Sequence, residues 1–299
     1  MPGRHPHLMV EPTQRAWRTG WLVLALGLQG WADPGFGSAL SRIEARLQGR
    51  IGVFALRGAA VVSHRAGERF AYCSTFKWVL AAAILKGVDE GRLDLDRIMA
   101  YGQRDLLPHS PVTASRVKEG GMSIGALCAA TIATSDNAAA NLLGPLAGGP
   151  AGLQAFVRGL GDSVMRFDRV EPQLNSNLPG DPRDTTSPEA MARLLRTVLE
   201  TDVLSRASRE RLLAWMKATA TGANRIRAGL PQGWAIAHKT GTGSRGAVND
   251  VAVLFPPEGT PVYLCVFIDG AGADDRRREA AIAEATRLAL KALRQGSLR

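Results

Sequence analysis

The segment Ser74-Thr-Phe-Lys-Trp-Val-Leu-Ala-Ala-Ala-Ile-Leu85 joins a serine and a lysine to a long apolar run. Such a run is typical of a buried helix, and we predict a helix over 74–88. Residues three apart share a helix face, so Lys77 is expected one turn above Ser74. A serine hydroxyl is a weak nucleophile at neutral pH and needs a base within hydrogen-bond reach. The segment therefore predicts a buried helix that begins with a Ser-Lys pair.

Two rarer strings follow in the same chain, Ser135-Asp136-Asn137 and His238-Lys239-Thr240-Gly241. Lys239 would supply a second cation for an anionic substrate, and its charge would help Lys77 to lose its proton. The hydroxyl of Ser135 is suited to relay that proton to a leaving amine. The three strings together predict an acyl-transfer site.

Acyl transfer also needs hydrogen-bond donors for the oxyanion of the tetrahedral intermediate. We expect one donor to be the backbone N–H of Ser74 at the helix start. The second is expected on the strand that carries Lys239, at Thr242.

These motifs together resemble those of the class A serine β-lactamases, in the superfamily that includes the penicillin-binding proteins. The resemblance covers nearly the whole chain after the leader and includes Arg166-Phe167-Asp168-Arg169, Asp184-Thr185-Thr186 and Arg225-Ile226-Arg227. It implies hydrolysis of the β-lactam amide of penicillins and cephalosporins through an acyl-enzyme on Ser74, which confers antibiotic resistance. It implies no cofactor and no metal.

A fourth string, Glu171-Pro172-Gln173-Leu174-Asn175, lies within 166–184. This stretch has little periodicity and is typical of an Ω-type functional loop. By resemblance, Glu171 and Asn175 hold the water that attacks the acyl-enzyme. Such a base disfavours two alternatives, a penicillin-binding DD-peptidase and a non-catalytic β-lactam sensor, because both must keep the acyl-enzyme from hydrolysis. Lys77 and Glu171 both remain candidates for the base in acylation.

The resemblance also implies a set of residues that bind the substrate. They are Asn137, Lys239, Thr240, Gly241, Thr242, Arg225 and His109. Arg225 would bind the substrate carboxylate in place of an arginine that many relatives carry where this chain has Val248-Asn249-Asp250. His109 matches the place of an aromatic residue and is expected to stack on the substrate. We expect His238 to be a strand residue rather than a base, because the Ser-Lys pair leaves it no role.

The chain contains three cysteines, Cys73, Cys128 and Cys265. By resemblance, some family members bond a cysteine at the first position to one just after the Lys-Thr-Gly strand, and that partner position is Gly243 here. We therefore expect Cys73 to be a free thiol beside the site. Cys128 and Cys265 are expected in the core, since free cysteine packs as a small hydrophobe.

Residues 1–32 read as a secretory signal peptide, in which Arg15 and Arg18 precede the apolar stretch 21–28 and Ala32 precedes the cleavage point. The net charge is +10, but the arginines are scattered along the chain and do not favour nucleic-acid binding. We expect a periplasmic or secreted monomer whose partner is a small β-lactam. Neither nucleic-acid binding nor stable membrane insertion after signal cleavage is expected.

The order of the periodic segments predicts a two-lobed fold. Strands are expected near 51–56, 59–62, 234–239, 248–255 and 262–268. Helices are expected near 36–48, 74–88, 123–134, 136–147, 151–160, 187–201, 205–219 and 274–295. The terminal helices should flank one antiparallel sheet. Residues 33–299 would then form a catalytic domain with an α/β lobe (33–68 and 220–299) and an all-α lobe (69–219), and the site would lie between the lobes.

Overall fold

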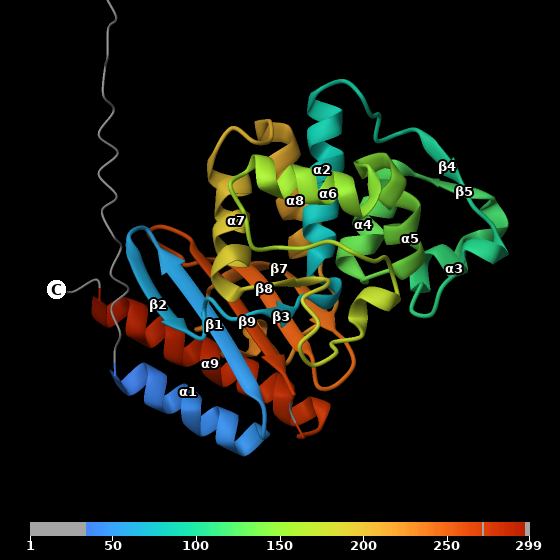
Figure 1. Ribbon diagram of the computed structural model, residues 1–299. Helices are drawn as coiled ribbons and strands as arrows, with labels where there is room; N and C mark the ends of the chain where they lie inside the picture. The colour runs from blue at the N-terminus through green and yellow to red at the C-terminus, as the bar shows by residue number, and fades with distance from the viewer. Residues whose placement is uncertain (1–33, 271, 297–299) are drawn as a thin grey trace, which may run out of the picture.

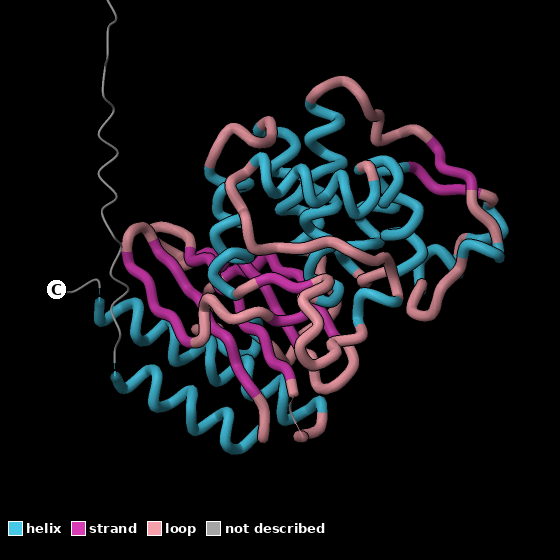
Figure 2. Tube along the Cα trace, viewed as in Figure 1, coloured by secondary structure: helices cyan, strands magenta, loops and turns pink. Residues whose placement is uncertain are grey.

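The computed structural model describes residues 34–270 and 272–296, so the predicted signal peptide lies outside the described residues. Both ends of this part of the chain form a sheet with flanking helices, and its middle forms a group of helices beside the sheet (Figures 1 and 2). This arrangement confirms the predicted fold class. None of the described helices is long and apolar enough to cross a membrane.

The five strands of the main sheet pair in antiparallel fashion throughout. In spatial order they are β2 (Ala60–His64), β1 (Arg50–Arg57), β9 (Val262–Asp269), β8 (Val248–Phe255) and β7 (Ala235–Thr242). Helices α1 (Pro34–Leu47) and α9 (Asp275–Gly296) lie together on one face (Figure 1). Helix α7 (Pro188–Glu200) packs on β1 and β9. Because both faces are covered, all but the last residue of β8 are buried, including the polar Asn249 and Asp250.

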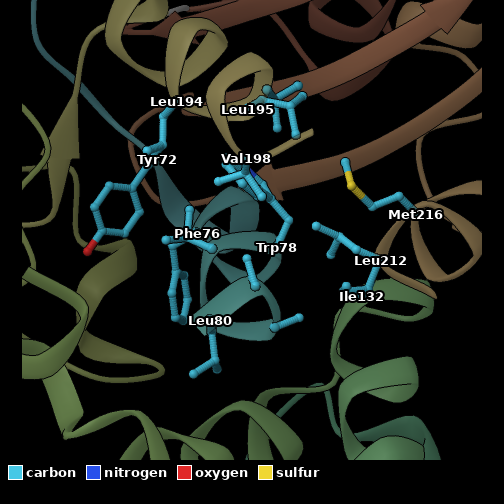
Figure 3. Close-up of a cluster of buried hydrophobic side chains, with 14 of the residues drawn as sticks. Tyr72, Phe76, Trp78, Leu80, Ile132, Leu194, Leu195, Val198, Leu212 and Met216 are labelled. Carbon is cyan, nitrogen blue, oxygen red and sulfur yellow. The ribbon is translucent and has the colours of Figure 1, made fainter. Parts of the chain in front are cut away.

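Helix α2 (Lys77–Asp89) runs through the centre of the helical part. It contacts α4 (Ile124–Ala133), α5 (Asn137–Leu143), α6 (Gly149–Gly159) and α8 (Arg206–Lys217), while α3 (Pro111–Ser115) packs on α4. Figure 3 shows Trp78 of α2 among side chains from α7 and α8, such as Val198 and Leu212. Full burial of each such side chain stabilises the fold by about 1.5–3 kcal/mol. This apolar packing fixes the helix that begins just after Ser74.

Several helices begin at a side chain that caps them. Ser123, Ser187 and Ser205 each accept a hydrogen bond from the backbone N–H three residues later, and Asp136 does the same for Ala139. A cap satisfies one of the N–H groups that the first helical turn leaves without a partner. These caps explain why the predicted helix starts agree with the structure to within two residues at α4, α5, α7 and α8.

The structure contains short elements that the sequence did not predict. Strand β3 (Phe70–Ala71) pairs with β6 (Thr185–Thr186), and β4 (Ile98–Ala100) pairs with β5 (Gly121–Ser123). The 3₁₀ turns are η1 (Cys73–Phe76), η2 (Gln103–Asp105), η3 (Val117–Glu119), η4 (Gly144–Ala147), η5 (Gln173–Asn175) and η6 (Ile226–Gly229). Elements of two to four residues are too short to carry a periodic pattern.

The Ω-type loop over 166–184 is closed at its neck by an ion pair. Arg169 pairs with Asp184, which is fully buried. Asp184 Oδ1 also accepts hydrogen bonds from the backbone N–H groups of Asp168 and Arg169 and from the hydroxyl of Tyr72. The loop is thereby tied to the segment that leads to Ser74.

Candidate active site

Ser74 lies in the 3₁₀ turn η1, which runs directly into α2. Its side chain is almost buried, with 8% of the residue exposed. The preceding residue, Cys73, has a φ of +49°, which is uncommon for a residue other than glycine. The predicted helix start is therefore a tight turn that presents Ser74 at the N-terminal end of α2.

Lys77 is fully buried beside Ser74. Its Nζ lies 3.0 Å from Oε1 of Glu171, and it donates to Asn137 Oδ1 at 2.6 Å and to the carbonyl oxygen of Ser135 at 2.7 Å. Burial lowers the pKa of Lys77, and the nearby charge of Glu171 opposes this shift. A lysine with a lowered pKa sheds its proton more readily and suits a catalytic base.

Glu171 is 1% exposed and faces Ser74 from the Ω-type loop. Its Oε1 accepts from the hydroxyl of Ser74 at 3.1 Å, and its Oε2 accepts from Nδ2 of Asn175 at 2.5 Å. Two hydrogen bonds with Asn141 of α5 fix its backbone: Asn141 Nδ2 donates to the carbonyl oxygen of Glu171 at 2.8 Å, and the Glu171 N–H donates to Asn141 Oδ1 at 3.1 Å. Asn141 could not be identified from the sequence, because an asparagine within a helix is part of no motif.

Lys239 of β7 is also fully buried. Its Nζ donates to Ser135 Oγ at 3.0 Å, while Lys77 Nζ lies 3.4 Å from the same oxygen. Burial lowers the pKa of Lys239 well below its usual value, and the charge of Lys77 adds to this shift. The hydroxyl of Ser135 therefore lies between the Nζ atoms of Lys77 and Lys239 and can pass a proton on.

The end of β7 brings Thr240, Gly241 and Thr242 beside η1. The hydroxyls of Thr240 and Thr221 are 2.6 Å apart. A Cβ atom at Gly241 would lie 2.8 Å from the carbonyl oxygen of Tyr72, so only glycine permits this approach. The structure thus brings the end of β7 against the turn that carries Ser74.

The side chain of Arg225 is only 9% exposed and makes four hydrogen bonds. Nε donates to Glu279 at 3.0 Å, Nη1 donates to the carbonyl oxygens of Gly241 and Asn249 at 3.0 Å each, and Nη2 donates to Thr242 Oγ1 at 2.8 Å. The sequence predicts that this group binds the substrate carboxylate, and that role stays a prediction. In the structure its donors are directed at protein atoms, and Nη2 is the one that reaches a side chain at the end of β7.

His109 lies at the rim of the site and is exposed. It has a φ of +59°, and its Nε2 lies 3.0 Å from the carbonyl oxygen of Thr134. Its own carbonyl oxygen accepts from the N–H of Asn137. The loop of His109 therefore helps to place Asn137, and stacking of the ring on a substrate stays a prediction.

His238 is fully buried in β7, where its Nδ1 lies 3.0 Å from Oδ1 of Asp250 on β8. The contact with Asp250 gives the buried imidazole a hydrogen-bond partner, so its burial is explained without a catalytic role.

All three cysteines are free and buried. A Cβ atom at Gly243 would lie 2.6 Å from Cys73 Sγ, so Gly243 occupies the place beside the thiol that the resemblance indicated. Burial raises the pKa of Cys73, which keeps the thiol protonated. Among the described residues, no cluster of three or more His, Cys, Asp or Glu side chains could hold a metal ion.

We expect thermal melting curves recorded with and without a reductant to coincide, because no disulfide contributes to stability in the described residues. Differential scanning calorimetry of the mature protein checks this. A melting temperature several degrees lower in the reductant would contradict the free state of the thiols.

The comparisons with known proteins agree with this geometry. The model of the β-lactamase enzyme family matches residues 36–293. The carbapenem-hydrolyzing β-lactamase KPC of Klebsiella oxytoca is 44% identical over 283 residues, which cover 91% of this chain and 96% of that protein. The imipenem-hydrolyzing β-lactamase of Enterobacter cloacae is 41% identical, with 85% and 88% covered.

Among solved structures, a variant of the class A β-lactamase of the last common ancestor of Gram-negative bacteria matches with a TM-score of 0.86 and 48% identity, covering 88% of this chain and 99% of that one. The putative class A β-lactamase PenP of Rhodopseudomonas palustris matches with a TM-score of 0.84 and 46% identity, covering 86% and 99%. The chain belongs to the β-lactamase enzyme family. Within it, the chain is a class A serine β-lactamase, which confirms the resemblance drawn from the motifs.

Proposed function

We propose that this enzyme hydrolyses penicillins and cephalosporins through an acyl-enzyme on Ser74. The observation that carries the proposal is the position of the Glu171 carboxylate, 3.1 Å from Ser74 Oγ, 3.0 Å from Lys77 Nζ and 2.5 Å from Asn175 Nδ2. A nucleophile, two candidate bases and a water-orienting amide thus meet at one point.

In acylation, Ser74 Oγ attacks the β-lactam carbonyl carbon and its proton passes to Lys77 or Glu171. The backbone N–H groups of Ser74 and Thr242 stabilise the oxyanion. When the intermediate collapses, the C–N bond breaks and the ring nitrogen takes a proton from Ser135 Oγ, which Lys77 replaces. This relay is supported by the position of Ser135 Oγ between Lys77 and Lys239.

In deacylation, Glu171 takes a proton from a water that attacks the ester, and Ser74 leaves with a proton returned to its oxygen. The buried Oδ1 of Asn175 has no hydrogen-bond partner among the described residues, so it is able to accept from that water. A DD-peptidase or a β-lactam sensor needs no base at this place.

The carboxylate shared by these substrates is proposed to bind Lys239 and the hydroxyls of Thr240 and Thr242. Arg225 acts through Thr242: since its Nη2 donates to Thr242 Oγ1, the hydroxyl proton of Thr242 is free to point at the substrate. Asn137, which accepts from Lys77 Nζ and donates to the carbonyl oxygen of Pro108, is proposed to contact the substrate side chain from the opposite rim.

We expect Arg225→Ala to raise KM for benzylpenicillin about tenfold, because Thr242 loses its orienting donor. The variant should also melt at a lower temperature, since the partly buried Glu279 loses its cation partner and the carbonyl oxygens of Gly241 and Asn249 lose a buried donor. Steady-state kinetics and melting curves test both effects. Arg287→Ala, which removes an exposed arginine bound to a carbonyl oxygen near the same turn, is the control. A KM within twofold of the parent value would contradict the role of Arg225.

Carbapenems carry the same reactive amide, and two relatives are named for their hydrolysis. We therefore include carbapenems among the proposed substrates. We further propose that the enzyme acts in the periplasm or outside the cell, as the leader-like sequence over 1–32 indicates. We also propose that it acts as a monomer and without nucleic acid.

Rapid-quench mass spectrometry of the wild-type protein with benzylpenicillin tests the proposed intermediate. We expect a transient adduct on the peptide that contains Ser74, and none in Ser74→Ala. An adduct on another residue would contradict the assignment.

A further inference from the structure

The proposed oxyanion hole takes its two N–H donors from segments far apart in the sequence. Ser74 lies in η1, and Thr242 is the last residue of β7. Such a donor acts only where it lies about 2.7–3.1 Å from the position that the oxyanion will occupy. Contacts between the two segments must therefore fix the separation of the donors.

Strand β7 packs directly on the turn that leads to Ser74. A Cβ atom at Gly241 would lie 2.8 Å from the carbonyl oxygen of Tyr72 and 3.1 Å from the backbone nitrogen of Thr75. The turn also contains Cys73 in a left-handed conformation. A non-glycine residue keeps such a conformation only where its surroundings hold it.

The side chain of Asn249 reaches this turn from the neighbouring strand β8. Asn249 is fully buried and lies opposite Gly241 in the register of β7 and β8. Its Nδ2 donates to the carbonyl oxygen of Ala71 at 2.8 Å and to that of Tyr72 at 3.2 Å. Its Oδ1 accepts from the N–H of Ile268 on β9 at 3.4 Å, which sets the orientation of the amide.

We propose that Asn249 is a positioning residue that holds the two donors of the oxyanion hole at one separation. Its amide joins the turn before Ser74 to β8 through two hydrogen bonds. The backbone hydrogen bonds of the sheet join β8 to β7, which ends at Thr242. Asn249 touches no reacting atom. The amide nitrogen of Asn249 has two N–H groups and donates to both carbonyl oxygens. A serine has one donor and an alanine has none, so neither could make both hydrogen bonds. The inference rests on the proposed acyl-enzyme.

The test compares Asn249→Ala with the parent, each in a Glu171→Gln background that accumulates the acyl-enzyme. The infrared band of the ester carbonyl reports how strongly the oxyanion hole polarises it. We expect the band to move to higher wavenumber in Asn249→Ala, because displaced donors polarise the carbonyl less. In the protein with Glu171 intact, kcat/KM for benzylpenicillin should fall about tenfold, less than the 100- to 1000-fold cost of removing a whole donor.

The control is Thr286→Val, which removes a buried hydrogen bond within α9. It should lower the melting temperature and leave the band unchanged. An unchanged band in Asn249→Ala, with a kcat/KM equal to that of the control, would overturn the positioning role. If Asn249→Ala does not fold, Asn249→Ser gives the same comparison: a shifted band supports the role, and an unshifted band overturns it. If the Glu171→Gln parent forms no adduct on Ser74, the proposed function itself fails, and this inference fails with it.

Discussion

Glu171→Gln is expected to react with benzylpenicillin and then remain acylated on Ser74, with hydrolysis of the ester slowed about 100- to 10,000-fold. Glutamine keeps the shape of the side chain between Ser74 and Asn175 but cannot take a proton from water. Acylation continues because Lys77 remains as a base. The intermediate that the wild-type enzyme forms only briefly should therefore accumulate.

Intact-mass spectrometry of Glu171→Gln should show one adduct of the mass of benzylpenicillin that persists after excess drug is removed. The double variant Ser74→Ala, Glu171→Gln is the control and should show no adduct. Steady turnover at the wild-type rate would remove Glu171 from the mechanism.

Lys77→Met is expected to slow acylation about 100- to 10,000-fold and to leave no adduct to accumulate. Methionine fills most of the volume of the fully buried lysine but has no base. Because the variant leaves the buried Glu171 carboxylate without its cation partner, it should melt below the wild-type temperature. Circular dichroism at the assay temperature then separates a catalytic loss from an unfolded protein.

The pH dependence of acylation gives a second measure of Lys77. Burial lowers the pKa of Lys77, so the neutral amine becomes more abundant as the pH rises through that value. Wild-type kcat/KM should therefore rise with pH on its acidic side, and Lys77→Met should lose the part of this rise that belongs to the amine. An identical acidic limb in both proteins would assign the acylation base to Glu171 alone.

Much of this fold could be predicted from the sequence, because its long elements carry local signals. The predicted strand over 248–255 coincides with β8, and the predicted helix over 205–219 corresponds to α8 within two residues at each end. The helix predicted over 74–88 begins instead as the 3₁₀ turn η1. That turn depends on contacts with β7 and β8, which no local pattern contains.

The same distinction applies to the site. Ser74, Lys77 and Glu171 could be named from motifs, because their residue types and spacing express the chemistry. Asn141 and Asn249 could not, because their importance lies in hydrogen bonds to backbone atoms distant in sequence.

Arg225 is a residue whose position could be predicted from the sequence but whose hydrogen-bond partners could not. Its position beside β7 was predicted, but its donors turn to Glu279 and Thr242. The direction of a long side chain depends on partners that only the folded chain brings together.

The most direct test of the account is to count the benzylpenicillin molecules that each molecule of purified mature enzyme hydrolyses. With a thousandfold excess of drug, loss of the β-lactam absorbance should go to completion, and Ser74→Ala should hydrolyse none above the buffer rate. Consumption that stops at one drug molecule per enzyme would contradict the account, because it would make the protein an acylated sensor or a DD-peptidase rather than a hydrolase.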